Sequence, residues 1–218
     1  AETQRALADA VNAAGPGRLA EACAARGTRF FHLSTDYVFD GSADRPYRED
    51  DAPHPLNAYG AGKLEGERRV QAAGGNTLII RVQSLFGVHG EHFIRKILRR
   101  LEGGAEGLQV VDDQVTSPTY TRHVAQALVR LAETSRQGVV HVAASGSCSW
   151  YAFARETLRL LNLENPVTPV PSSAFPMPAR RPPRSVLDTS RLRDWTGKFL
   201  PTWQEGLCEY LEAEKMQT

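Results

Sequence analysis

The chain has 218 residues, of which 41% are hydrophobic and 23% are charged, as expected for a globular protein of one domain or slightly more. Lys and Arg (26) nearly balance Asp and Glu (25), so the net charge of +1 argues against a broad basic face for nucleic acid. No apolar run reaches the roughly 18 residues of a membrane span, and we expect neither a membrane segment nor a signal peptide. Three scattered cysteines without a CxxC pair fit a reducing compartment, so we expect a cytoplasmic protein.

Helical spacing of apolar residues predicts the helices, and short, continuously apolar runs predict buried strands. In chain order the expected elements are a helix over 6–23 interrupted at Gly15-Pro16-Gly17, a strand over 29–34, a long loop over 35–57, a helix over 59–73, a strand over 77–82, a helix over 91–102, a strand over 108–111, a helix over 121–134, a strand over 139–142, and helices over 150–162, 189–195 and 203–214. We expect Thr119 or Thr121 to cap the helix near residue 121, and Ser149 to cap the helix at residue 150.

Strands alternate with helices, and the strand runs are apolar throughout. This pattern predicts an α/β fold with a doubly wound parallel sheet that is covered on both faces. The three strong strands are few for such a sheet. Seven prolines between Pro166 and Pro183 argue against a central strand in that segment.

Tyr59 and Lys63 are the first candidates for chemistry. They stand at i and i+4 of a predicted helix, so both lie on one face. A neighbouring ammonium stabilises a phenolate, and the positive end of the helix dipole acts in the same direction. We therefore expect a lowered pKa for Tyr59, which would serve in proton transfer. An ordinary surface pair is the alternative for these two residues.

A second candidate group follows the strand that ends near Leu33. Ser34, Thr35 and Asp36 come at its carboxyl end, where ligands bind in open α/β sheets. Their hydroxyls can donate to a carbonyl oxygen, and the carboxylate can accept from a sugar hydroxyl. The alternative is that these side chains only cap a turn.

Four segments carry a resemblance that extends over nearly the whole chain. They are STDYVFDG (34–41), YREDDAPHPLNAYGAGKLEGE (47–67), VVDDQVTSPTYT (110–121) and RPPRSVLDTSRL (181–192). In this order and spacing they resemble the dTDP-4-dehydrorhamnose reductases of the extended short-chain dehydrogenase/reductase family. The resemblance implies a Rossmann-type fold and hydride transfer from NADPH or NADH to the 4-keto group of a dTDP-linked 4-keto-6-deoxyhexose, which would give dTDP-L-rhamnose.

The resemblance also implies roles for individual residues. Tyr59 would protonate O4, Lys63 would assist it and hold the nicotinamide ribose, and Thr35 would hydrogen-bond the substrate oxygen. The residues implied to bind the cofactor are Ser34, Tyr59, Lys63, Val82 and Gln83. Those implied to bind the substrate are Thr35, Asp36, Tyr37, Val38 and Ser84. Many relatives carry Trp where Ser84 stands here, and Ser or Thr where Gly62 stands here.

The same resemblance predicts the domain organisation. Residues 1–86 would be the later part of a dinucleotide-binding domain, 87–118 an excursion into the substrate domain, 119–145 a return to the sheet, and 146–218 the region that binds the nucleotide sugar. The first βαβ unit of the family, with its phosphate-binding turn, would precede residue 1. The Rossmann-type sheet would therefore be incomplete, and we expect the chain to bind NAD(P) weakly. NADH or NADPH preference, a Mg²⁺ dependence and a homodimeric state are left open.

Other patterns in the sequence give weaker evidence of a functional site. Gly60, Gly62 and Gly66 follow no strand, so they do not predict a dinucleotide turn. We expect no metal site at Asp112-Asp113 or at His89 and His92, which lack ligand spacing. Arg181, with Arg180 and Arg184, either clamps a diphosphate or belongs to a solvated loop. The alternative functions are a related nucleotide-sugar epimerase or dehydratase, and a non-catalytic regulatory subunit like that of methionine adenosyltransferase.

Overall fold

A computed structural model of the chain describes residues 1–216. Its centre is a three-stranded parallel sheet in the order β1-β2-β7, with β1 at Phe30–Thr35, β2 at Thr77–Val82 and β7 at Gly138–Val142. The three strands end together, because Thr35 lies in register with Val82, and Val82 with Val142. Their carboxyl ends therefore form one edge.

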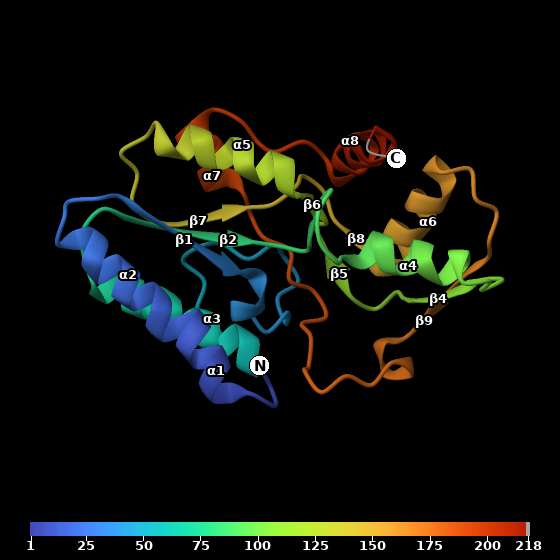
Figure 1. Ribbon diagram of the computed structural model, residues 1–218, viewed down its shortest axis with the longest axis horizontal. Coiled ribbons are helices and arrows are strands. Elements are labelled where there is room, and N and C mark those ends of the chain that lie inside the picture. Colours follow the sequence, from blue (N-terminus) through green and yellow to red (C-terminus); the bar gives the residue numbers. More distant parts are fainter. Residues whose placement is uncertain (217–218) are drawn as a thin grey trace.

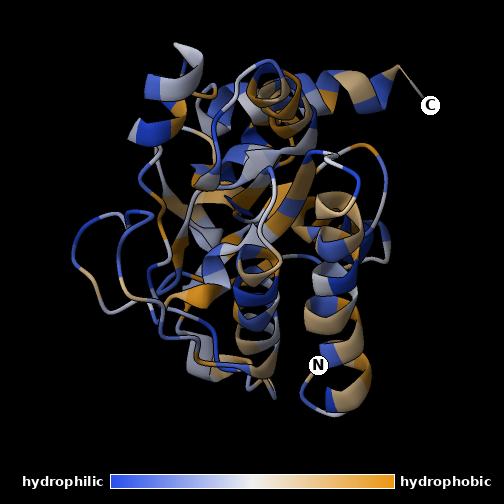
Figure 2. Cartoon of the chain, turned by 90° about the vertical axis from the view of Figure 1, so that its left-hand side faces the viewer, coloured by the Kyte–Doolittle hydropathy of each residue, from blue (hydrophilic) through white to orange (hydrophobic). Residues whose placement is uncertain are grey.

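Helices cover both faces of this sheet (Figure 1), so the predicted α/β class is confirmed. α2 (Gly15–Ala24) and α3 (Ala58–Ala72) lie on one face, and α5 (Thr121–Ala132) and α7 (Ser190–Thr196) lie on the other. Segments at the centre of the molecule are mostly hydrophobic and the outer loops mostly hydrophilic (Figure 2). One core cluster joins β2, β7, α5 and α7 through Leu78, Ile80, Val140, Leu131 and Leu192.

The predicted break at Gly15-Pro16-Gly17 is wrong. Helix runs on from α1 (Arg5–Asp9) through a π-helical turn (Ala10–Ala14) into α2. Pro16 has no N–H to give to the carbonyl four residues back. The wider π turn, in which Gly15 N–H bonds to the Ala10 carbonyl, lets the helix pass the proline. A Cβ on Gly66 of α3 would lie 2.1 Å from the Asn12 carbonyl oxygen, so this turn packs closely on α3.

A second region stands beside the carboxyl edge of the sheet, on the right in Figure 1. α4 (Phe93–Glu102) and α6 (Trp150–Leu160) pack there beside a two-stranded parallel sheet of β4 (Leu108–Val111) and β9 (Val167–Val170). The Pro-rich segment thus contributes only a strand of a two-stranded sheet, which agrees with the expectation that it supplies no central strand. β9 itself was not predicted.

The predicted bounds of β2 and β4 are confirmed. Ser149 caps α6 by accepting from the Ala152 N–H, as predicted. The predicted cap of α5 is wrong: Tyr120 precedes that helix without a side-chain cap, and the Thr119 hydroxyl bonds instead to Ser117 and Ala144. The remaining elements are β3 (Leu85–Phe86), β5 (Val115–Thr116), β6 (Thr119–Tyr120), β8 (Cys148–Ser149), α8 (Trp203–Lys215) and the 3-10 turns Asp36–Val38 and Ser172–Ala174.

Candidate active site

The turn after β1 places the first polar side chains of the site. Thr35 ends the strand, and its hydroxyl accepts from the Tyr37 N–H at 3.2 Å and donates to the Asp36 carboxylate at 3.1 Å. These short contacts hold residues 35–37 in one turn at the carboxyl edge of the sheet. The turn-capping role and the ligand-facing position therefore coexist, since all three residues also line a pocket.

α3 begins directly against this turn. Asn57 caps the helix by accepting from the Gly60 N–H at 2.8 Å, and its side-chain amide donates to the Arg180 carbonyl. A Cβ on Gly60 would lie 2.1 Å from the Tyr37 carbonyl oxygen, so only glycine permits this approach. Tyr59 consequently stands beside the turn, with its ring 6.1 Å from that of Tyr37 in an edge-to-face arrangement.

The ionisation of Tyr59 differs from the prediction. Burial raises the pKa of its hydroxyl, a hydrogen bond with Thr35 opposes the rise, and the Asp36 charge adds to it. The expected lowering by Lys63 is wrong for this arrangement, because the ammonium of Lys63 donates to the Leu33 carbonyl at 2.6 Å. Burial lowers the pKa of Lys63, and the charge of Glu67 counteracts this.

Asp36 and Gln83 form a buried pair behind the turn. The amide nitrogen of Gln83 donates to Asp36 at 3.3 Å and to the Ser185 hydroxyl at 3.0 Å. Burial raises the pKa of Asp36 to about 6, against hydrogen bonds from Ser185, Thr35 and Gln83. This carboxyl is therefore linked both to the active-site turn and to the segment that carries Arg181.

A pocket of about 600 Å³ opens between the sheet edge and the second region. Six of the residues named from the sequence line it: Thr35, Asp36, Tyr37, Tyr59, Ser84 and Arg181. Five others lie outside its lining: Ser34, Val38, Lys63, Val82 and Gln83.

Packing explains these outer positions. Val38 is fully buried in a core cluster with Phe39 and Leu64, so its side chain lies outside the lining of this pocket, and its place on the sugar site stays a prediction. Val82 belongs to the core between the sheet and α5. The buried hydroxyl of Ser34 donates a hydrogen bond to the Glu67 carboxylate of α3.

The opposite wall of the pocket was not predicted. α4 contributes Lys96 and Arg100, whose spacing of four residues places them on one helix face. Trp150 and Phe93 lie with ring centroids 4.8 Å apart, and Phe175 and Met177 border the pocket from the Pro-rich segment. The one sequence signal for this wall was the basic face of an amphipathic helix, which is usually a solvated surface.

Within residues 1–216 no group of three or more His, Cys, Asp and Glu side chains could hold a metal ion. Asp112 accepts from the Ser149 hydroxyl, and Asp113 accepts from the Ser172 N–H, so both carboxylates hold loops together. In the same part of the chain, no helix is both long and apolar enough to cross a membrane.

The chain is similar to known proteins in sequence and in fold. The family model described as "RmlD substrate binding domain" matches residues 1–216. The chain is 42% identical to the dTDP-4-dehydrorhamnose reductase of Streptomyces griseus, over 98% of this chain and 72% of that protein. It is 39% identical to the dTDP-4-dehydrorhamnose reductase of Mycobacterium tuberculosis, over 100% of this chain and 74% of that protein.

The fold matches a crystal structure of dTDP-4-dehydrorhamnose reductase from Bacillus anthracis in complex with NADP. The TM-score is 0.94 at 36% identity, and the match covers 98% of this chain and 75% of the other. The chain therefore belongs to the family of the RmlD substrate binding domain, together with these dTDP-4-dehydrorhamnose reductases.

Proposed function

We propose that this protein reduces the 4-keto group of dTDP-4-dehydro-L-rhamnose to give dTDP-L-rhamnose, with a nicotinamide dinucleotide as the reductant. One observation carries the proposal: Thr35 and Tyr59 lie together on one wall of a 600 Å³ pocket, in a chain 42% identical to a reductase of that name. The volume lies in the range of small-ligand sites.

Tyr59 is the proton donor in this proposal. Because burial raises its pKa, its hydroxyl is protonated near neutral pH, as a general acid must be. A proton passes from Tyr59 to the carbonyl oxygen at C4, while the Thr35 hydroxyl donates a hydrogen bond to that same oxygen. The phenolate that remains is stabilised by Lys63, one helical turn away, when an ammonium donor that the Leu33 carbonyl does not engage turns toward it.

The nicotinamide, when bound, supplies the hydride that adds to C4. Lys63 can donate to the hydroxyls of the nicotinamide ribose, since an ammonium has three donors and the Leu33 carbonyl takes one of them. We propose that Ser34, Val82 and Gln83 border the nicotinamide through their backbone, because their side chains are engaged elsewhere. NADPH is the proposed form, since the Bacillus anthracis relative is in complex with NADP. A Mg²⁺ requirement is not part of the proposal.

The far wall of the pocket suits the nucleotide. Lys96, Arg100 and Arg181 put three cations on the pocket, against the negative charges of a diphosphate. Trp150 and Phe93 provide aromatic surface for the thymine base. Asp36 and Tyr37 remain the proposed contacts of the deoxysugar, next to Ser84. The domain boundaries at residues 86, 118 and 145 and a homodimeric state stay predictions.

An assay of NADPH oxidation tests this proposal. The protein is mixed with dTDP-4-dehydro-L-rhamnose and with NADPH in large excess, because weak cofactor binding is expected, and dTDP-glucose, which has no keto group, is the control. The expected result is loss of NADPH absorbance with the keto sugar alone, and a product identified by NMR as dTDP-L-rhamnose. Epimerised or dehydrated sugar without NADPH oxidation would contradict the proposal.

A further inference from the structure

A row of polar side chains crosses all three strands of the central sheet just before its carboxyl edge. Ser34 of β1 lies in register with Arg81 of β2, and Arg81 lies in register with His141 of β7. All three side chains are buried. Buried charge is costly, and apolar replacements of buried ion pairs are often neutral or stabilising, so stability alone is a weak reason for this row.

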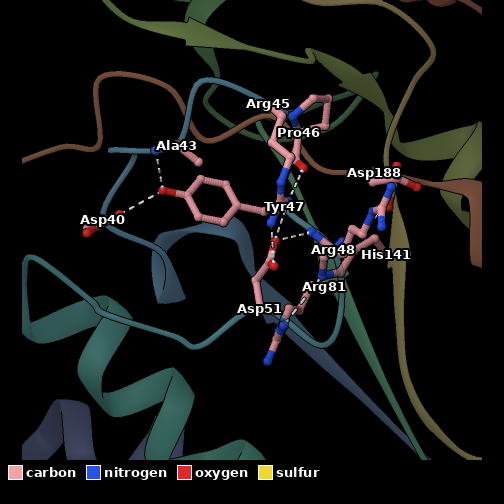
Figure 3. Close-up of polar contacts among 10 residues, drawn as sticks. All are labelled: Asp40, Ala43, Arg45, Pro46, Tyr47, Arg48, Asp51, Arg81, His141 and Asp188. Atoms are coloured by element: carbon pink, nitrogen blue, oxygen red, sulfur yellow. Dashed lines mark hydrogen bonds and ion pairs between the residues drawn. The ribbon is translucent and has the colours of Figure 1, made fainter.

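Glu67 of α3 closes the row from the helix side. Its carboxylate accepts from Arg81 Nε at 2.9 Å and from Arg81 Nη2 at 2.7 Å, and it also accepts from the Ser34 hydroxyl. The remaining Arg81 nitrogen lies 3.4 Å from His141 Nε2, and Figure 3 shows these two side chains close together. A bidentate pair of this kind fixes direction as well as distance.

Glu67 shares its helix face with the active-site residues. Tyr59, Lys63 and Glu67 follow one another at intervals of four residues along α3. Lys63 reaches the Leu33 carbonyl, and Glu67 reaches the side chain of the next residue, Ser34. α3 is thus attached to β1 at two successive residues, directly behind Thr35.

We propose that Glu67 is a positioning residue of the reductase: by holding the Ser34–Arg81–His141 row, it fixes the rotation and axial position of α3, and so sets Tyr59 and Lys63 against the carboxyl end of β1. A slide of α3 by one residue would turn the helix by about 100° and carry Tyr59 away from Thr35. The expected effect on kcat rests on the proposed function, whereas the placement of α3 by Glu67 does not.

The test is the Glu67→Gln variant, which keeps the shape of the side chain and removes its charge. The expected result is a kcat at least tenfold lower, with a KM for the nucleotide sugar within twofold of wild type. Glu65→Gln is the matched control on the same helix, because Glu65 pairs with Arg69 on the outer face and should leave kcat within twofold. Leu131→Ala controls for lost stability, since Leu131 is buried on the opposite side of the sheet.

Equal losses of kcat in Glu67→Gln and in Leu131→Ala would overturn the proposal, as would an unchanged kcat in Glu67→Gln. If Glu67→Gln does not fold, Glu67→Gln/Arg81→Met removes both charges, and the same kcat loss is expected in a folded protein. If wild type shows no turnover, the proposed function fails, but the geometry is still tested by the backbone ¹H–¹⁵N NMR signal of Tyr59, which lies two helical turns from Glu67 and outside the direct contacts of that carboxylate. A shifted signal in Glu67→Gln, but not in Glu65→Gln, supports the positioning role, and an unshifted one refutes it.

Discussion

The two walls of the pocket are built in different ways. The sheet-side wall carries Thr35 and Tyr59, which backbone contacts and caps within residues 33–63 hold in place. The far wall brings together α4, β4, α6 and the Pro-rich segment, and its cations Lys96 and Arg100 are exposed. In the proposed function, the first wall, which these contacts hold in place (the rigid wall), performs the chemistry, and the far wall binds the nucleotide.

The largest effect should come from the rigid wall. Tyr59→Phe removes the proton donor and keeps the ring, so kcat should fall on the order of 10²–10⁴-fold. The KM for the nucleotide sugar should change little, because the far wall is intact. Steady-state NADPH oxidation measures both constants. The neighbouring Tyr37→Phe variant is the control for a tyrosine of the same pocket, and an equal loss of kcat there would remove the special role of Tyr59.

The next effect should come from the far wall. Arg100→Ala removes a charged donor for the diphosphate, so the Kd for dTDP should rise about tenfold, and kcat should stay near wild type. Calorimetric titration of dTDP measures the Kd, and raised salt should shrink the difference between variant and wild type. Arg99→Ala on the outer side of α4, where Arg99 pairs with Glu91, is the matched control. Identical losses of affinity in the two variants would mean that Arg100 contributes only general charge.

A smaller effect is expected at the mouth of the pocket. Phe175 is 37% exposed and borders the pocket from the Pro-rich segment, so Phe175→Ala should cost little stability. Loss of its apolar contact should raise the KM for the nucleotide sugar about threefold. The same KM as wild type would place Phe175 outside the ligand contact.

A separate effect concerns stability and pH. The folded pKa of Asp36 is raised from 3.8 to about 6, so the folded state binds the extra proton between these values. Its contribution to stability is therefore lost as pH rises from 4 to 6. Burial lowers the pKa of His32 to about 4 and that of His141 to about 3, and these groups act in the opposite direction over the same pH range.

The comparison of wild type with Asp36→Asn isolates the carboxyl. In thermal unfolding between pH 4 and pH 7, the stability of wild type relative to the variant should fall as pH rises to 6 and then level off. Parallel unfolding curves across this range would show that the carboxyl keeps an ordinary pKa.

Much of the rigid wall could be predicted from the sequence, because its signals are local. The apolar run of β2 and the i, i+4 spacing of Tyr59 and Lys63 lie within single elements. The pKa of Tyr59 could not be predicted, because it depends on burial and on the Leu33 carbonyl that engages Lys63.

The far wall could not be predicted for a related reason. Lys96 and Arg100 have the pattern of any solvated helix face, and only the tertiary fold turns them toward a pocket. The parallel pairing of β9 with β4 joins segments about 60 residues apart, which no local pattern predicts. Pro169 lies within β9, and a proline argues against a strand in a prediction from sequence.

The division of labour between the two walls is tested most directly by a double-mutant cycle of Tyr59→Phe and Arg100→Ala. The account predicts additivity: the double variant combines the kcat loss of one with the Kd loss of the other, within about 0.5 kcal/mol. A double variant no worse than the poorer single variant would contradict the account, because the two walls would then act as one unit.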